Sequence, residues 1–138
     1  MILRETIIMI SQLMSIVPGK IGIYIRMIWY RYQWKIPKSI EIKLFSEFIS
    51  PRNIMFKGKA SLSNNCFFTA ENSFIEIGEN FACNTNFHAN ASIGGKIKIG
   101  NNVIVGPNVV LRTANHNYLN KDKLIKNQGH NFGDIIIR

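Results

Sequence analysis

From residue 75 onward, every sixth position of the chain carries a large apolar side chain. The series has seven consecutive members: Ile75, Phe81, Phe87, Ile93, Ile99, Val105 and Leu111. A weaker upstream series of Ile54, Ala60 and Cys66 is offset from it by three positions, so we expect a shift of register at about residues 70–75. A period of six matches neither an α-helix nor a simple alternating strand. It is typical of a parallel β-helix, in which short strands meet at tight corners.

Glycine and asparagine stand where the corners of such a β-helix would fall. Glycine directly follows Ile93, Ile99 and Val105, and the chain includes 16 asparagines. Both residue types tolerate the left-handed backbone conformation that a corner needs. We therefore expect coils of about 18 residues, three repeats each, that stack about 4.8 Å apart. The alternative fold is an ordinary β-sandwich whose strands align by chance.

Composition limits the class of protein. A length of 138 residues fits one domain, and 46% hydrophobic with 18% charged residues is too apolar for a disordered chain. Two cysteines do not make a disulfide framework. The longest uncharged run, residues 6–19, is too short to cross a bilayer, and Glu5 and the lack of an Ala-x-Ala site disfavour a secretory signal. We expect a cytoplasmic protein.

The segment 1–38 differs from the rest of the chain. Apolar periodicity predicts helices over 7–17 and 21–34, separated by Pro18-Gly19, and the second helix carries one apolar face made of Ile21, Ile25, Ile28 and Tyr32. The segment holds six Lys or Arg against one Glu, interleaved with Trp and Tyr. These helices either cap the open end of the solenoid or make a peripheral contact with the inner face of a membrane, and the two roles are compatible. A nucleic-acid partner is not expected, because no helix-turn-helix, zinc or base-stacking signature accompanies the charge.

Four stretches of the chain resemble a known family. They are residues 77–86 (IGENFACNTN), 99–109 (IGNNVIVGPNV), 113–117 (TANHN) and 133–137 (GDIII). Over about residues 50–138 the chain resembles the hexapeptide-repeat acyltransferases, nearest to the maltose and galactoside O-acetyltransferases and to the O-acetyltransferases of bacterial surface polysaccharides. The resemblance implies an all-β fold, a left-handed parallel β-helix over residues 39–138 with a loop at about 115–131, preceded by the basic helical segment 1–38.

The same resemblance implies an activity. It predicts a homotrimer that moves an acetyl group from acetyl-CoA to a saccharide hydroxyl in the biosynthesis of bacterial surface polysaccharide or lipopolysaccharide, with no bound cofactor and no metal. Family members continue with further coils that form much of the acetyl-CoA groove between subunits. The resemblance therefore leads us to expect a C-terminally truncated chain, with the residues that bind acetyl-CoA mostly beyond Arg138.

His116 is the candidate catalytic residue. It ends the repeat that begins at Leu111, and the residues that follow it, through Asn131, lose the six-residue phase, which predicts a long loop. Loops of that length are usually functional or disordered. A neutral imidazole can take the proton of a sugar hydroxyl as its oxygen attacks a thioester, and the resemblance assigns this general-base role to His116. The resemblance also places Asn84 where relatives hold the acceptor by a hydrogen bond, although Asn84 could equally turn a corner.

Two other functions compete with acetyl transfer. The γ-carbonic anhydrases, also left-handed β-helices, bind a metal through three histidines, but His88, His116 and His130 are not separated by whole numbers of predicted coils. Cys66 and Cys83, close to one coil apart, are interpreted as two buried thiols. The other alternative is an inactive β-helix scaffold or paralogue. No nucleophile elbow and no phosphate-binding glycine loop is present in the sequence.

Overall fold

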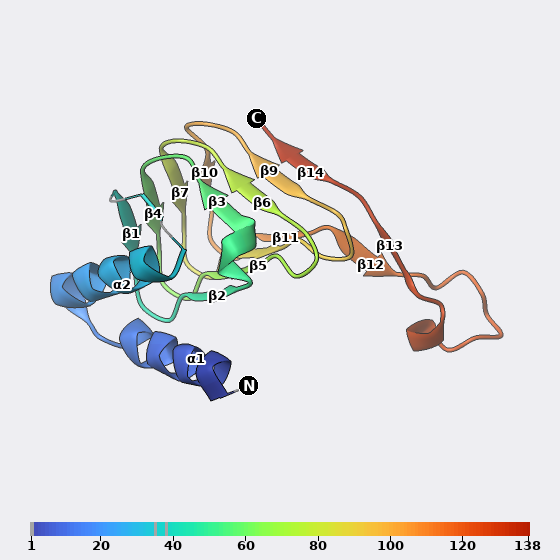
Figure 1. Cartoon of the computed structure of the whole chain (residues 1–138). Coiled ribbons are helices and arrows are strands. Elements are labelled where there is room, and N and C mark those ends of the chain that lie inside the picture. Colours follow the sequence, from blue (N-terminus) through green and yellow to red (C-terminus); the bar gives the residue numbers. More distant parts are fainter. Residues whose placement is uncertain (1, 35, 38) are drawn as a thin grey trace.

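The computed structural model describes residues 2–34, 36–37 and 39–138. Two helices, α1 (Ile2–Ser15) and α2 (Gly19–Trp34), precede a left-handed parallel β-helix. The β-helix is triangular, and each of its three sides is a four-stranded parallel sheet built from successive coils (Figure 1). The predicted fold is confirmed.

Each sheet takes one strand from every coil. The first sheet contains β1 (Ile40–Ile42), β4 (Ala60–Leu62), β7 (Phe81–Cys83) and β10 (Ile104–Val105). The second contains β2 (Glu47–Ile49), β5 (Phe67–Thr69), β8 (His88–Asn90) and β11 (Val110–Arg112). The third contains β3 (Ile54–Phe56), β6 (Ile75–Ile77), β9 (Ile97–Ile99) and β14 (Ile135–Ile137). A 3-10 turn, η1 (Pro51–Asn53), lies between β2 and β3.

The coils are longer than the six-residue repeat predicts. Ile40 pairs with Ala60, Ala60 with Phe81, and Ala82 with Ile104, so each coil is one residue longer than the coil before it. Only the corner from the third sheet to the first keeps a six-residue step, because the other two corners hold extra residues. The offset of three between the two apolar series comes from these extra residues. There is one between β4 and β5, and there are two between β5 and β6.

The inward side chains form a continuous apolar core. Ile75, Phe81, Phe87 and Ile99 of the six-residue series are at most 1% exposed. Ile93 is the exception, because it stands at the corner between β8 and β9 with φ 55° and is 42% exposed. Membership in the six-residue series therefore does not identify Ile93 as an inward-pointing residue. A fixed period cannot follow a corner that lengthens from coil to coil.

Asparagine, more than glycine, supplies the left-handed corners. Six asparagines have a positive φ: Asn65, Asn72, Asn80, Asn86, Asn102 and Asn108. Their side chains also bond from coil to coil, as Asn65 Nδ2 donates to Asn86 Oδ1 at 2.7 Å and Asn86 Nδ2 to Asn108 Oδ1 at 2.7 Å. Gly94 has φ 88°, but Gly100 and Gly106 do not have a positive φ. The stacked amides thus stabilise one corner from coil to coil.

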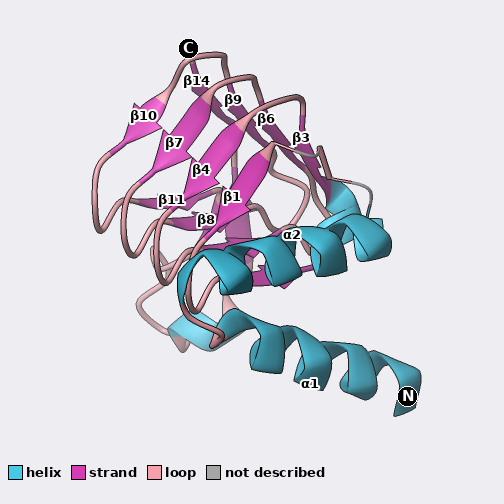
Figure 2. Cartoon of the chain, turned by 90° about the vertical axis from the view of Figure 1, so that its left-hand side faces the viewer, coloured by secondary structure: helices cyan, strands magenta, loops and turns pink. Residues whose placement is uncertain are grey.

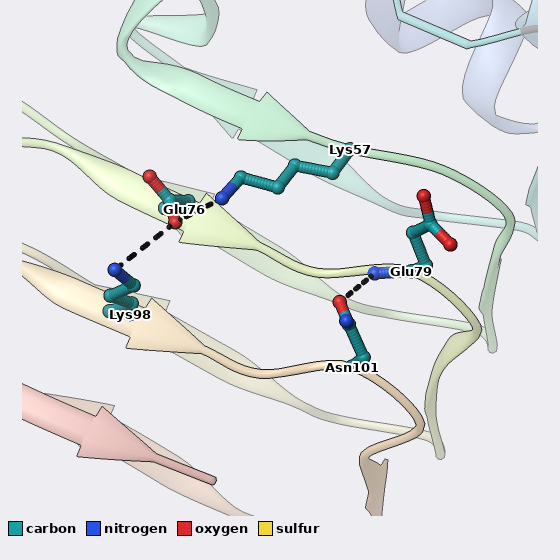
Figure 3. Close-up of polar contacts among 5 residues, drawn as sticks. All are labelled: Lys57, Glu76, Glu79, Lys98 and Asn101. Atoms are coloured by element: carbon teal, nitrogen blue, oxygen red, sulfur yellow. Dashed lines mark hydrogen bonds and ion pairs between the residues drawn. The ribbon is translucent and has the colours of Figure 1, made fainter.

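The outer face of the third sheet is a solvent-facing charge ladder. Glu76 Oε1 lies 2.6 Å from Lys57 Nζ and 3.6 Å from Lys98 Nζ, one coil to either side (Figure 3). The hydrogen bond from Lys57 lowers the pKa of Glu76. At the next corner, Asn101 Oδ1 accepts a hydrogen bond of 2.9 Å from the backbone N–H of Glu79 (Figure 3).

The helices cover the open end of the first coil, beside β1 (Figure 2). The buried face of α2 consists of Gly22, Arg26 and Tyr30, which follow one another at intervals of four. The apolar face predicted for this helix points outward, since Ile21 is 74%, Ile28 50% and Tyr32 86% exposed. Among the described residues, no helix combines the length and the hydropathy that spanning a bilayer requires.

Arg26 determines which face of α2 is buried. Its side chain, 1% exposed, donates to the backbone carbonyl oxygens of Met14, Val17 and Ile42 at 3.0, 2.8 and 2.7 Å. Burial lowers its pKa. The guanidinium therefore caps the C-terminus of α1, where the helix dipole favours a cation, and joins both helices to β1. Arg26, which the sequence counts among the basic residues of this segment, is thus not available to an external partner.

Candidate functional site: the hairpin that leaves the fourth coil

The corner between the second and third sheets grows along the solenoid. It takes four residues between β2 and β3, five between β5 and β6, six between β8 and β9, and the whole of 113–134 between β11 and β14. This last insertion forms a hairpin of β12 (Ala114–His116) and β13 (His130–Phe132), with the turn η2 (Ile125–Asn127) near its tip. The hairpin projects away from the solenoid, so its tip makes no part of the core (Figure 1).

Thr113 joins the root of the hairpin to the preceding coil. Its buried hydroxyl accepts a hydrogen bond of 2.9 Å from Ser92 N–H and donates one of 3.1 Å to Ser92 O. On the returning strand, Gly133 N–H donates to Thr113 O at 2.9 Å and Asp134 Oδ1 accepts from Lys96 N–H at 2.8 Å. The solenoid therefore holds in place the residue before β12 and the residues after β13, where the hairpin leaves and rejoins it.

His116 lies on β12, opposite His130 on β13. The two strands are antiparallel, and the imidazole ring centroids are 4.1 Å apart with an angle of 45° between the ring planes. His116 is half-buried and His130 is exposed. The backbone N–H of His116 donates to Asn115 Oδ1 at 2.9 Å, which holds the strand locally. The packing against His130 limits the orientations that the His116 ring can adopt.

Gln128 organises the loop beyond the two histidines. Its Nε2 donates to the carbonyl oxygens of Asn120 and Lys123 at 2.7 and 2.8 Å, and its Oε1 accepts from Asn120 N–H at 3.0 Å. Asn117 Nδ2 donates to Gln128 O at 3.1 Å. Hydrogen bonds therefore order the loop, which has no apolar core of its own, and Tyr118 is exposed.

Asn84 lies at a different corner from His116. It follows β7 on the way to β8, is exposed, and its Oδ1 accepts a hydrogen bond of 2.7 Å from Thr85 N–H. This is the turn-forming role that a corner asparagine has. Within one chain the structure therefore does not bring Asn84 and His116 together, and the role of Asn84 toward an acceptor stays a prediction.

His88 is the third histidine and occupies the outer face of β8. Its ring meets Phe67 of the preceding coil edge-on, with centroids 4.6 Å apart. Its Nε2 and the nearby Asn90 Oδ1 are buried without a hydrogen-bond partner. Burial, together with the charge of Arg112 on β11, lowers the pKa of His88. His88 follows the buried Phe87, so alternation along the strand places it outward. The unpaired polar atoms become evident only when the coils are stacked.

Metal-ligand side chains do not converge in the described residues. No group of three or more His, Cys, Asp or Glu side chains there has a geometry suited to a metal ion. Cys66 and Cys83 are buried free thiols whose sulfur atoms lie 3.6 Å apart on neighbouring coils. The hydrogen bond with Cys66 and burial both raise the pKa of Cys83. Two thiols in contact inside the core are a packing feature.

Two cavities stand out in the described part of the chain, and His116 lines neither. One of about 560 Å³ lies between α1, the end of α2 and β2, with Ile7 and Phe48 in its wall. The other, of about 330 Å³, is an open hollow beside His88 and Val110 on the second sheet. His116 is half-buried and therefore lies on the surface outside both cavities.

Comparison with known proteins supports the hexapeptide-repeat assignment. Residues 82–113 match the family described as "Bacterial transferase hexapeptide (six repeats)". This stretch runs from β7 to the root of the hairpin and therefore ends just before β12, the strand that carries His116. No curated protein and no solved structure matches the chain. The match supports a transferase of the hexapeptide-repeat type and leaves the acyl group and the acceptor open.

Proposed function

We propose that this protein is an acyltransferase that moves an acetyl group from acetyl-CoA to a saccharide hydroxyl. The observation that carries the proposal is the place of His116, a half-buried imidazole at the base of a hairpin that leaves a hexapeptide-repeat β-helix. A net charge of +9 favours an anionic donor such as acetyl-CoA. The resemblance to O-acetyltransferases of surface polysaccharides supports a bacterial surface glycan, or an intermediate of its synthesis, as the acceptor.

The proposed step is direct transfer with His116 as general base. The imidazole takes the proton of the sugar hydroxyl as its oxygen attacks the thioester carbonyl. The new C–O bond forms, the C–S bond breaks, and His116 returns the proton to the departing thiolate. Holding both substrates at the hairpin lowers the entropic part of the barrier. Asn84 is proposed to form a hydrogen bond with the saccharide that accepts the acetyl group.

The resemblance also supports a homotrimer with its active sites between subunits. In one chain Asn84 and His116 occupy different corners, so a site that uses both residues would need Asn84 from a neighbouring subunit. Sedimentation should then show a trimer. A fully active monomer would contradict this part of the proposal.

The test is release of CoA by the purified full chain from acetyl-CoA with a panel of glycans. A thiol reagent can follow the reaction, because Cys66 and Cys83 are buried and react slowly. We expect His116→Ala to lower the rate about 100-fold or more. His88→Gln is the matched control and should keep the rate. A folded wild-type chain with no turnover on any acceptor would favour the scaffold alternative, and an unchanged rate in His116→Ala would remove His116 from the mechanism.

Asn84 is tested separately. Asn84→Ala should raise the KM for the acceptor with little change in kcat, because the predicted contact holds the ground state and the transition state alike. Asn101→Ala removes an exposed asparagine from another corner and should leave the KM for the acceptor unchanged. Equal effects of the two variants would leave Asn84 as a corner residue only.

A further inference from the structure

The outward face of α2 is apolar and aromatic, although the helix is firmly attached on its other side. Ile21, Tyr24, Ile28 and Tyr32 are all at least half-exposed, whereas the face around Arg26 packs on the first coil. The exposed residues follow one another at intervals of three or four, so they form one stripe along the helix. Contiguous exposed apolar surface of this kind marks an interaction site.

Basic residues border the stripe. Lys20 and Arg31 are separated by about three helical turns, so both fall on the same edge of the stripe. Lys20 is exposed and Arg31 is half-buried, and neither forms a salt bridge with any described residue. The segment 1–38 holds one acidic residue, Glu5, which lies on α1. An apolar stripe with tyrosines and a cationic edge is suited to a surface that offers both hydrocarbon and negative charge.

We infer that α2 binds the interface of an anionic phospholipid bilayer through this stripe. The isoleucines enter the acyl boundary, the tyrosine rings lie at headgroup level, and Lys20 and Arg31 contact lipid phosphates. Because the opposite face of α2 packs on the first coil, this end of the solenoid faces the membrane, and the hairpin projects from the other end (Figure 1). A protein–protein partner is disfavoured by the charge, since one side of the stripe is cationic and the stripe itself carries no acidic group.

Vesicle sedimentation of the full chain tests this inference. The chain should pellet with phosphatidylglycerol vesicles, pellet much less with phosphatidylcholine vesicles, and release as NaCl is raised from about 0.1 M to about 1 M. Ile28→Ser should weaken binding to the anionic vesicles about tenfold. Ile104→Ser, which removes an exposed isoleucine from the first sheet, is the matched control and should bind like the wild type. Absence of binding to anionic vesicles, or equal loss in both variants, would overturn the inference.

Site-specific labelling supplies a second measurement. Both native cysteines are buried, so a single introduced cysteine takes an environment-sensitive fluorophore selectively. Tyr32→Cys on α2 and Leu119→Cys on the hairpin replace two residues that are each 86% exposed. The label at position 32 should shift to shorter wavelength on anionic vesicles, and the label at 119 should not. Equal shifts at both positions, or self-association through position 32 without a response to lipid, would overturn membrane binding, the latter in favour of a second copy of the chain.

Discussion

His116 and His130 are register partners on antiparallel strands, and their ring centroids lie 4.1 Å apart. The sequence places them at opposite ends of a loop, and the hairpin brings them into contact. Because His130 packs against the proposed general base, we predict that it positions His116.

Loss of the His130 ring should misplace His116. We expect His130→Ala to lower kcat about tenfold with a small change in KM, since a misplaced base affects the transition state more than binding. His130→Phe keeps a ring at this position and should restore most of the rate. If Phe is no better than Ala, the packing of the two rings does not position His116.

Thr113 should control the root of the hairpin. Thr113→Val leaves Ser92 N–H and O without their partners, which costs about 1–3 kcal/mol of unfolding free energy. Thr113→Ser keeps the hydroxyl and should lose much less. Chemical denaturation of the three proteins measures the difference. Equal stability of the Val and Ser variants would show that the hydroxyl bonds contribute nothing.

Gly78 is required where two coils approach closely. A Cβ at this position would lie 2.5 Å from Gly100 O and 2.5 Å from Asn101 Oδ1, so Gly78→Ala should destabilise the fold by about 1–3 kcal/mol. Gly106→Ala is the control, because nothing lies within 4 Å of its added Cβ. Thermal unfolding should separate the two variants. A similar melting temperature for both would contradict the close approach.

Arg26 should be essential for the helical cap. Arg26→Met leaves one buried and two partly buried backbone carbonyl groups without this donor and should cost about 2–4 kcal/mol of unfolding free energy. Arg31→Met removes a cation from the outward edge of the same helix and should change the unfolding free energy, measured by chemical denaturation, by less than about 0.5 kcal/mol. If both substitutions had the same small effect, the carbonyl cap would not hold the helices.

The stability of the protein should fall in mild acid because of His88. Burial and Arg112 lower the pKa of His88 in the folded state, so the unfolded chain binds a proton more readily. The stabilising contribution is complete above the unfolded pKa of about 6.5 and is lost as the pH falls through the lower, folded pKa. His88→Gln should flatten the decline of unfolding free energy between about pH 7 and pH 5. Parallel curves for the two proteins would argue against a shifted His88.

The stacked coils of the solenoid can be predicted from the sequence because they depend on properties of neighbouring residues. Side chains alternate along a strand, and asparagine at Asn65 and Asn102 tolerates a left-handed corner, so a repeating pattern predicts stacked coils before any contact is known. The loss of the repeat after His116 likewise predicts the excursion that the structure shows as a hairpin. The chemical role of His116 stays a prediction.

Other features depend on contacts between residues that are distant in the sequence, so no local pattern predicts them. The coil length depends on how many residues each corner holds. The six-residue series does not reveal this, because its member Ile93 lies in a corner and is exposed. The buried face of α2 is the one that carries Arg26, whose hydrogen bonds reach the end of α1 and β1. The proximity of His116 and His130 follows from the antiparallel return of the hairpin. The solenoid can thus be predicted from the amino-acid sequence, because its repeat is local. Which of its surfaces stay exposed depends on contacts between distant residues.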